Sequence, residues 1–168
     1  EAPLRARFRP TAPVPGICRD ITPDNWIDIQ DNEFSLAGPG KWSDTVDDAA
    51  ASDGKAARMA TNHGEWAIQW PVPADMTAFG PVHVYAQLRC EASTTDGSAC
   101  VVGIYDGNTK GAVVQHLIPI SEIAGASYAL HDLGVYSLKE GMYFWAAPMN
   151  NPDVVTSLWV DRIILARE

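Results

Sequence analysis

The stretch Val82-His-Val-Tyr-Ala-Gln-Leu-Arg89 decides the fold class of this chain. Apolar residues occupy every second position in it, namely Val82, Val84, Ala86 and Leu88. Successive side chains of a β-strand point to opposite faces, so this alternation places the four apolar residues on one face. The stretch is therefore predicted to be a strand with one buried face.

Short apolar runs recur along the rest of the chain, separated by Gly, Pro, Asn and Asp. Strands are predicted at Trp26–Leu36, Trp42–Val46, Lys55–Ala60, Glu65–Val72, Val82–Glu91, Ala99–Asp106, Ala112–Ile120, Tyr128–Leu133, Met142–Pro148 and Thr156–Arg167. The most helical stretch, between Val46 and Ala60, is interrupted by Ser52-Asp-Gly54. Many short strands with turn signals roughly every 8 to 12 residues indicate an all-β fold. We predict an antiparallel β-sandwich, jelly-roll-like.

The composition suggests one domain preceded by a connecting segment. Residues 1–23 are rich in Pro, Arg and Ala, which is typical of a linker or an extended lead-in segment. Residues 24–168 are long enough for a single β-sandwich domain with its own core.

The charge excludes two classes of partner. Twelve basic and 21 acidic residues give a formal net charge of −9. Such a chain repels phosphate backbones and anionic lipid headgroups, so we expect neither nucleic acid nor a membrane as a partner. No apolar run approaches the roughly 18 residues that a membrane-spanning helix requires.

The cysteines leave two alternatives open. Cys90 and Cys100 flank a turn-rich stretch between two predicted strands, and a hairpin would bring them opposite each other. They form either a disulfide or two buried free thiols that act as small apolar side chains. Cys18 has no evident partner, and the sequence lacks the ligand spacing typical of zinc sites.

Catalytic motifs are absent from the sequence. It contains no nucleophile elbow, no phosphate-binding loop and no dinucleotide fingerprint. None of the four histidines has a second histidine or a cysteine at the spacing of metal ligands. Each is expected at the surface or hydrogen-bonded in the core: His63, His83, His116 and His131. We therefore expect a protein that is not an enzyme, although a pair of carboxylates acting as in a hydrolase or lyase stays as a minor alternative.

One carboxylate stands out in the final predicted strand. In Ser157-Leu-Trp-Val-Asp-Arg-Ile-Ile-Leu165, strand parity aligns Asp161 with Trp159, Ile163 and Leu165, and both faces of this strand are apolar. A buried ionised carboxylate is costly unless a cation or several donors satisfy it. Three alternatives are open for Asp161. It pairs with an arginine, such as Arg58 or Arg162, it binds a calcium ion together with other oxygen ligands, or it is solvated.

The first predicted strand carries further oxygen donors. In Ile29-Gln-Asp-Asn-Glu-Phe34, Gln30 and Asn32 point the same way, and the apolar parity shifts across this stretch. The shift predicts a bulge or a bend. The first and last strands of a sandwich often pair, so Gln30 and Asn32 could meet Asp161.

These features resemble those of family 6 and family 35 carbohydrate-binding modules, which are β-sandwich domains. The first-strand motif Ile29–Phe34, the segment Ala51-Ser-Asp-Gly-Lys55 and the last-strand motif Trp159–Ile164 follow one another in the same order as theirs. The resemblance implies a structural calcium ion with Gln30, Asn32 and Asp161 among its ligands. Asp48 or Asp53, in the acidic and loop-like stretch Val46–Gly54, would supply a further charge at this site. Two acidic ligands of the family pattern are amides here, Gln30 and Asn32, which predicts weaker calcium binding.

The resemblance also implies a sugar site on loops at one edge of the sandwich. Flat aromatic side chains stack on sugar rings, and planar polar groups bond to hydroxyls. By position, the candidates are Trp42, Tyr105, Asn108, Tyr128, Asn150 and Asn151. Four other tryptophans fall within predicted strands and are expected in the core: Trp66, Trp70, Trp145 and Trp159.

The function that follows is non-catalytic binding of a polysaccharide or oligosaccharide. The domain would tether a larger, secreted polysaccharide-active protein to its substrate, with the catalytic domain in the same polypeptide and an extracellular or periplasmic location. The alternative is a structural sandwich that packs against a catalytic domain and binds no sugar.

Overall fold

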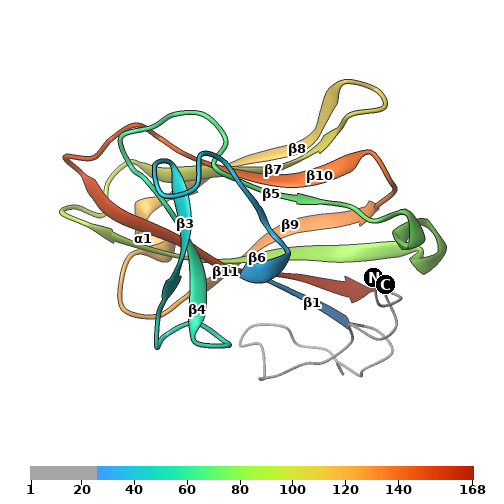
Figure 1. Cartoon of the computed structure of the whole chain (residues 1–168), viewed down its shortest axis with the longest axis horizontal. Coiled ribbons are helices and arrows are strands. Elements are labelled where there is room, and N and C mark those ends of the chain that lie inside the picture. The colour runs from blue at the N-terminus through green and yellow to red at the C-terminus, as the bar shows by residue number, and fades with distance from the viewer. Residues whose placement is uncertain (1–25) are drawn as a thin grey trace.

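A computed structural model describes residues 26–168 as two antiparallel β-sheets packed face to face (Figure 1). The first sheet contains β1 (Trp26–Gln30), β3 (Ser43–Asp47), β4 (Lys55–Met59), β6 (Pro81–Ala92), β9 (Ala129–Ser137) and β11 (Val155–Arg167). The second contains β2 (Ser35–Leu36), β5 (Ile68–Pro71), β7 (Ser98–Asp106), β8 (Gly111–Pro119) and β10 (Met142–Pro148). The predicted all-β antiparallel sandwich is confirmed. The predicted lead-in segment, residues 1–23, lies outside the described residues.

The helical content is small. One short helix, α1 (Ile120–Ile123), connects β8 to β9, and 3₁₀ turns cover Asp31–Glu33 and Ala74–Phe79. None of these was predicted. Among residues 26–168, no helix is long and apolar enough to span a bilayer.

The first predicted strand proved to be two strands in different sheets. β1 ends at Gln30, the 3₁₀ turn Asp31–Glu33 follows, and β2 continues in the opposite sheet beside β5. The parity shift noted in the sequence therefore marks a crossing between sheets and not a bulge within one strand.

The final strand β11 is the centre of the first sheet. It pairs along its length with β6, while its other edge is shared by β4 in the first half and β1 in the second half. The predicted neighbourhood of the first and last strands is confirmed, with Gln30 opposite Arg162.

A β-bulge interrupts β11 at Asp161, between the pairs that Val160 and Arg162 make with β6. An extra residue reverses the parity of a strand. Ile163 therefore lies in the main core, whereas Trp159 lies on the other face under Arg89. The expectation that Trp159, Asp161 and Ile163 share one face was wrong for this reason. Both faces of β11 are nevertheless buried, as predicted, because Ile164 packs in a second apolar cluster.

The two cysteines in the described part are buried free thiols. Cys90 lies on β6 opposite Leu158, and Cys100 lies on β7 opposite Ile118, so the two residues belong to different sheets. The predicted hairpin between these strands does not form. Of the two alternatives, the structure has the free thiols.

Candidate functional site

The outer face of the second sheet is rich in aromatic side chains. Trp70, Phe144 and Ile104 point into the core, so the residues that alternate with them point outward. A groove of about 570 Å³ lies on this face and is lined by Glu65, Trp66, Gln69, Tyr105, Ala112, Gln115, Tyr143 and Trp145. Four aromatic rings and two amides thus line one hollow in an antiparallel sheet. We call it the aromatic groove.

The rings of the aromatic groove come from neighbouring strands and from the loop before β5. Tyr143 lies opposite Tyr105 in the β10–β7 pair, with ring centroids 5.3 Å apart and planes tilted by 33°. Trp66 precedes β5 and is 42% exposed, which is high for so large an apolar side chain. Exposed aromatic faces next to amides can stack on sugar rings and bond to their hydroxyls.

Trp145 lies close to the sheet because the residue opposite it is a glycine. Gly103 is its partner on β7, and a Cβ atom built there would lie 3.0 Å from the Trp145 indole nitrogen and 2.5 Å from the Val114 carbonyl oxygen. A side chain at position 103 would therefore displace the indole or the β8 backbone.

We expect Gly103→Ala to destabilise the protein by about 1–3 kcal/mol, the usual cost of forcing extra atoms into a tight site. Urea unfolding followed by the total tryptophan fluorescence would measure the loss of stability. The matched control is Gly111→Ala at the start of β8, where the nearest atom, the Thr109 hydroxyl oxygen, lies 3.9 Å from the added Cβ. Equal stability of the two variants would contradict this account of Gly103.

Sequence reasoning missed most of this groove. Trp66 and Trp145 were expected in the core, but Trp66 lies before β5 and Trp145 alternates with the buried Phe144. The run Tyr143-Phe-Trp145 offered a signal, because aromatic residues on both parities of a strand cannot all face the same core. Trp70 and Trp159 are buried, as predicted.

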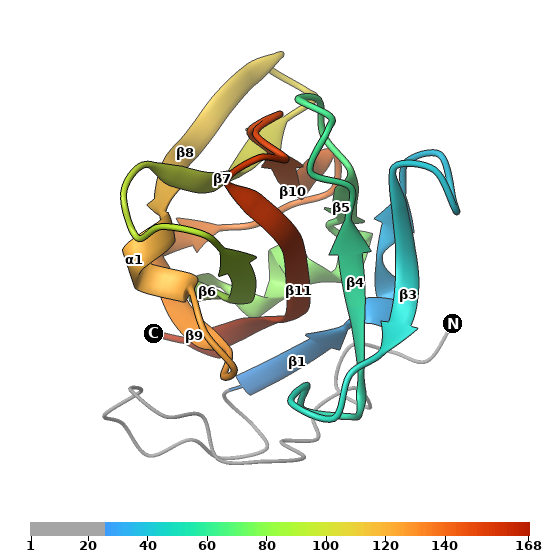
Figure 2. The ribbon, with the colours of Figure 1, turned by 90° about the vertical axis from the view of Figure 1, so that its left-hand side faces the viewer.

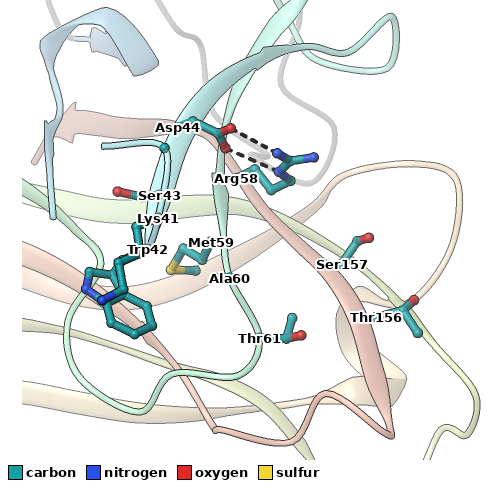
Figure 3. A pocket seen from close by; sticks show the side chains of 11 residues that line it. Lys41, Trp42, Ser43, Asp44, Arg58, Met59, Ala60, Thr61, Thr156 and Ser157 are labelled. Carbon is teal, nitrogen blue, oxygen red and sulfur yellow. Dashed lines mark hydrogen bonds and ion pairs between the residues drawn. The ribbon is translucent and has the colours of Figure 1, made fainter. Parts of the chain in front are cut away.

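A second, smaller pocket of about 290 Å³ lies between the β2–β3 loop, β4 and the start of β11 (Figure 3). Trp42 stands on one side of it, and the ion pair between Asp44 and Arg58 stands on another, with 2.9 Å between Oδ2 and Nη2. The Trp42 ring stacks on His63 at 4.3 Å between centroids, and the Lys41 ammonium lies 4.4 Å from the Trp42 ring. The predicted candidate Trp42 thus lines a pocket, but a different one from Tyr105.

The other predicted sugar-binding residues have local structural roles. Asn108 bonds through its side chain to Asp106 and to the Glu140 carbonyl, and so it stabilises a turn. Asn150 has a positive φ of 53° and donates its backbone N–H to the His63 carbonyl.

Asn151 and Tyr128 are held in a similar way. The Asn151 side-chain amide donates to the Ser98 carbonyl. The Tyr128 hydroxyl donates to Asp48 at 2.7 Å, and Tyr128 belongs to no part of the aromatic groove. The structure therefore does not bring the six predicted residues into one site. Loop position alone suggested them, and loop position does not determine where a side chain points.

The Asp161 carboxylate is fully buried at the bulge of β11. It accepts hydrogen bonds from the Ser52 backbone N–H at 3.1 Å and from the Ser52 hydroxyl at 2.9 Å. Burial raises the pKa of Asp161 from 3.8 to about 6, against the lowering effect of the bonds from Ser52. The carboxylate is thus neither solvated nor fully compensated.

The two arginines proposed as partners of Asp161 pair elsewhere. Arg162 forms a buried ion pair with Asp28 at 3.0 Å and donates to Gln87 at 2.7 Å. Arg58 pairs with Asp44. Within residues 26–168, the ion pairs include none with Asp161.

The predicted calcium ligands separate into three groups. Gln30 lies next to the Asp161 cluster, since its side-chain amide is 3.1 Å from the Ser52 hydroxyl and 2.9 Å from Asp28. Asn32 is exposed, and Asp53 is exposed and accepts from the Lys55 backbone N–H.

Asp48 belongs to a different cluster, with Arg89 and Tyr128. Its carboxylate bonds to Arg89 and to Tyr128, each at 2.7 Å, and the Arg89 guanidinium lies 3.9 Å from the Trp159 ring. Burial acts to raise the pKa of Asp48, but the bonds from Arg89 and Tyr128 hold it below its ordinary value. The expectation that Asp48 supplies a charge beside Asp161 finds no support in these contacts.

One more carboxylate is buried near the end of β1. Asp31 is almost inaccessible, and its Oδ1 atom has no hydrogen-bond partner. Burial, together with repulsion from Asp53, raises the pKa of Asp31. In the part of the chain that the structure describes, no three His, Cys, Asp or Glu side chains gather closely enough to hold a metal ion. A calcium site at Asp161 would therefore lack a cluster of three carboxylates, and the donors next to the Asp161 carboxylate are the neutral oxygens of Gln30 and Ser52.

No family model and no curated protein matches this sequence. Several solved structures share its fold. The xylan-binding CBM22-1 domain of Paenibacillus barcinonensis Xyn10C is 12% identical with a TM-score of 0.53, over 84% of this chain and 94% of that one. A family 35 carbohydrate-binding module from Clostridium thermocellum is 15% identical with a TM-score of 0.53, over 83% of this chain and 97% of that one.

A third structure contains this fold as one part of a larger protein. In the Podospora anserina GH26-CBM35 β-(1,4)-mannanase, 86% of this chain matches at 14% identity and a TM-score of 0.54. The chain spans 28% of the length of that protein. The predicted resemblance to carbohydrate-binding modules is confirmed at the level of the fold, since the sandwich is the one that these modules have.

Proposed function

We propose that this domain binds a polysaccharide through the aromatic groove and catalyses no reaction. The observation that carries the proposal is the gathering of Trp66, Tyr105, Tyr143 and Trp145 on the solvent-facing side of a sheet, where no core requires them. Gln69 and Gln115 supply donors and acceptors for hydroxyl groups. The shared fold with xylan-binding and family 35 modules adds support.

The preferred ligand is a neutral glycan. Glu65 is the one charged residue among the eight that line the groove, and the whole chain has a net charge of −9. An acidic glycan would meet repulsion without a compensating lysine or arginine in the lining. An open groove that runs over a sheet suits an extended chain of sugar rings, because it has space beyond one ring.

A structural calcium ion at Asp161 is a second part of the proposal. The Asp161 carboxylate, the Gln30 amide oxygen and the Ser52 hydroxyl come from β11, the end of β1 and the β3–β4 turn, and all are hard oxygen donors. A buried carboxylate without an ion pair supports a cation there. Such an ion would hold three segments together, and the single carboxylate favours weak binding.

The domain would act as a tether for an attached catalytic domain in a secreted protein. Binding through a few stacked rings is weak, but it raises the local concentration of the enzyme at the polysaccharide. The mannanase that carries this fold as one part of its length supports such an arrangement.

Affinity electrophoresis and calorimetry against neutral and acidic polysaccharides test the proposal. We expect retardation on at least one neutral glycan, weaker or no retardation on polyuronic acids, and no release of reducing sugar. A chelator should lower the melting temperature if calcium binds at Asp161. Failure to bind any glycan would favour a structural sandwich that packs against another domain.

A further inference from the structure

Two histidines meet where the two sheets end side by side. β8 is the edge strand of the second sheet, and β9 is the edge strand of the first. Figure 2 shows both strands beside α1, which connects them. His116 Nδ1 on β8 lies 2.9 Å from His131 Nε2 on β9, and the rings are edge to face with centroids 5.1 Å apart. This pair could not be predicted from the sequence, because 14 residues lie between the two positions.

Both histidines point toward the interior of the sandwich. His116 lies opposite Val102 and His131 lies opposite Ala86, and directly opposite residues share a face of the sheet. Val102 and Ala86 are fully buried members of the core. The pair therefore lies between the sheets at their open edge, and the His131 side chain is still 14% exposed.

A carboxylate orients one of the two rings. Glu122 Oε1, on α1, lies 2.5 Å from His131 Nδ1. The carboxylate accepts a hydrogen bond from Nδ1–H, and in the neutral ring this leaves Nε2, 2.9 Å from His116 Nδ1, as the nitrogen without a proton. Histidines that bind metal ions commonly donate their second ring nitrogen to a carboxylate in this way.

We propose that His116 and His131 bind one divalent transition-metal ion of the zinc, nickel or copper class, with Glu122 positioning His131. Imidazole nitrogens prefer these ions over calcium or magnesium. A tetrahedral ion with bonds of about 2.0–2.1 Å would hold the two nitrogens about 3.3 Å apart, slightly farther than they are now. Within residues 26–168 no third ligand of the His, Cys, Asp or Glu type joins them, so water completes the coordination.

Such an ion would link the edges of the two sheets. Two protein ligands are fewer than the four of a typical structural zinc site, so the ion should exchange readily. Because it binds only the folded state, it should raise the melting temperature with its concentration. This site is independent of the proposed sugar binding and of the proposed calcium ion.

Titration of the untagged chain with zinc chloride in excess calcium chloride tests the site. We expect binding of one zinc ion per chain by calorimetry, and a loss of affinity of at least tenfold in His116→Asn and in His131→Asn. Glu122→Gln should weaken binding by about tenfold to a hundredfold, as for other residues that orient a metal ligand. Long-range ¹H–¹⁵N spectra of the wild-type chain should show zinc on His131 Nε2 and His116 Nδ1, whether or not the variants fold.

His83→Gln is the matched control. His83 contacts two carboxylates, Asp132 at 2.5 Å from its Nε2 and Glu168 at 3.4 Å from its Nδ1, but no second histidine faces it. This variant should bind zinc like the wild type. The proposal is overturned if the chain binds no zinc, if both histidine variants keep wild-type affinity, or if His83→Gln loses as much affinity as they do.

Discussion

Replacing Trp145 by alanine should weaken polysaccharide binding by at least tenfold, which corresponds to about 1.4 kcal/mol at 25 °C. The indole lies against Gly103 in the middle of the aromatic groove, next to Tyr143 and Tyr105 on the same sheet. Removing it takes away one of the two indole rings of the groove and leaves a gap between Gln69 and Gly103, the residues that lie opposite Trp145 on the neighbouring strands. Calorimetry with the best neutral ligand would measure the change.

The fold should tolerate this substitution, because Trp145 lies outside the core and only part of its ring is covered. Leu117→Ala is the matched control: Leu117 is 60% exposed, lies on β8 of the same sheet, and does not line the groove. Full binding by the control and loss by Trp145→Ala would locate the ligand. Equal binding by both variants would exclude the aromatic groove as the sugar site.

In the metal-free protein, the contribution of Asp161 to the free energy of unfolding should fall as the pH rises from about 4 to about 6. The folded protein holds a proton on Asp161 up to its raised pKa of about 6, whereas the unfolded chain releases that proton near 3.8. Between these values folding takes up a proton, so each rise in pH removes stability, by about 3 kcal/mol over the whole interval. Urea unfolding of the wild type and of Asp161→Asn in a chelator, at several pH values, would measure this contribution.

The variant Asp161→Asn isolates the effect of this one group. It keeps an oxygen that can accept from Ser52 but has no charge to bury, so the difference between wild type and variant should change with pH between 4 and 6. Without metal at neutral pH we expect Asp161→Asn to be more stable than the wild type. With calcium we expect the wild type to be the more stable of the two, because an ion at Asp161 would stabilise only the wild type. A difference that is constant with pH would show that the carboxylate is not strained by burial.

The strands could be predicted from the sequence because their signal is local. Alternation in Val82–Arg89 and the turn signals around it require no knowledge of distant residues, and β6 and β10 appear close to where they were expected. The sheet crossing at Asp31–Glu33 and the bulge at Asp161 could not be predicted in this form. Both depend on which strand pairs with which and in what register, and neither the pairing nor the register can be derived from the alternation within one strand.

The candidate site was harder to predict for a related reason. Tyr105 was expected to contact sugar and does line the aromatic groove, but Trp66 and Trp145 were assigned to the core. An aromatic side chain in a strand looks the same in sequence whether it faces the core or an open groove. Only the parity of its neighbours, here the buried Phe144, separates the two cases.

The position of β11 between β6 on one side and β4 and β1 on the other has a consequence for folding kinetics. Pairing Trp26 with Ala166 closes a loop that contains almost every other described residue, and the entropy of that closure is lost before the contacts form. Chains with such distant pairings fold in milliseconds to seconds and not in microseconds. A proteolytic cut in any intervening loop would leave one fragment with β1 and the other with β11, and each fragment would have an unsatisfied strand edge that only the other fragment matches.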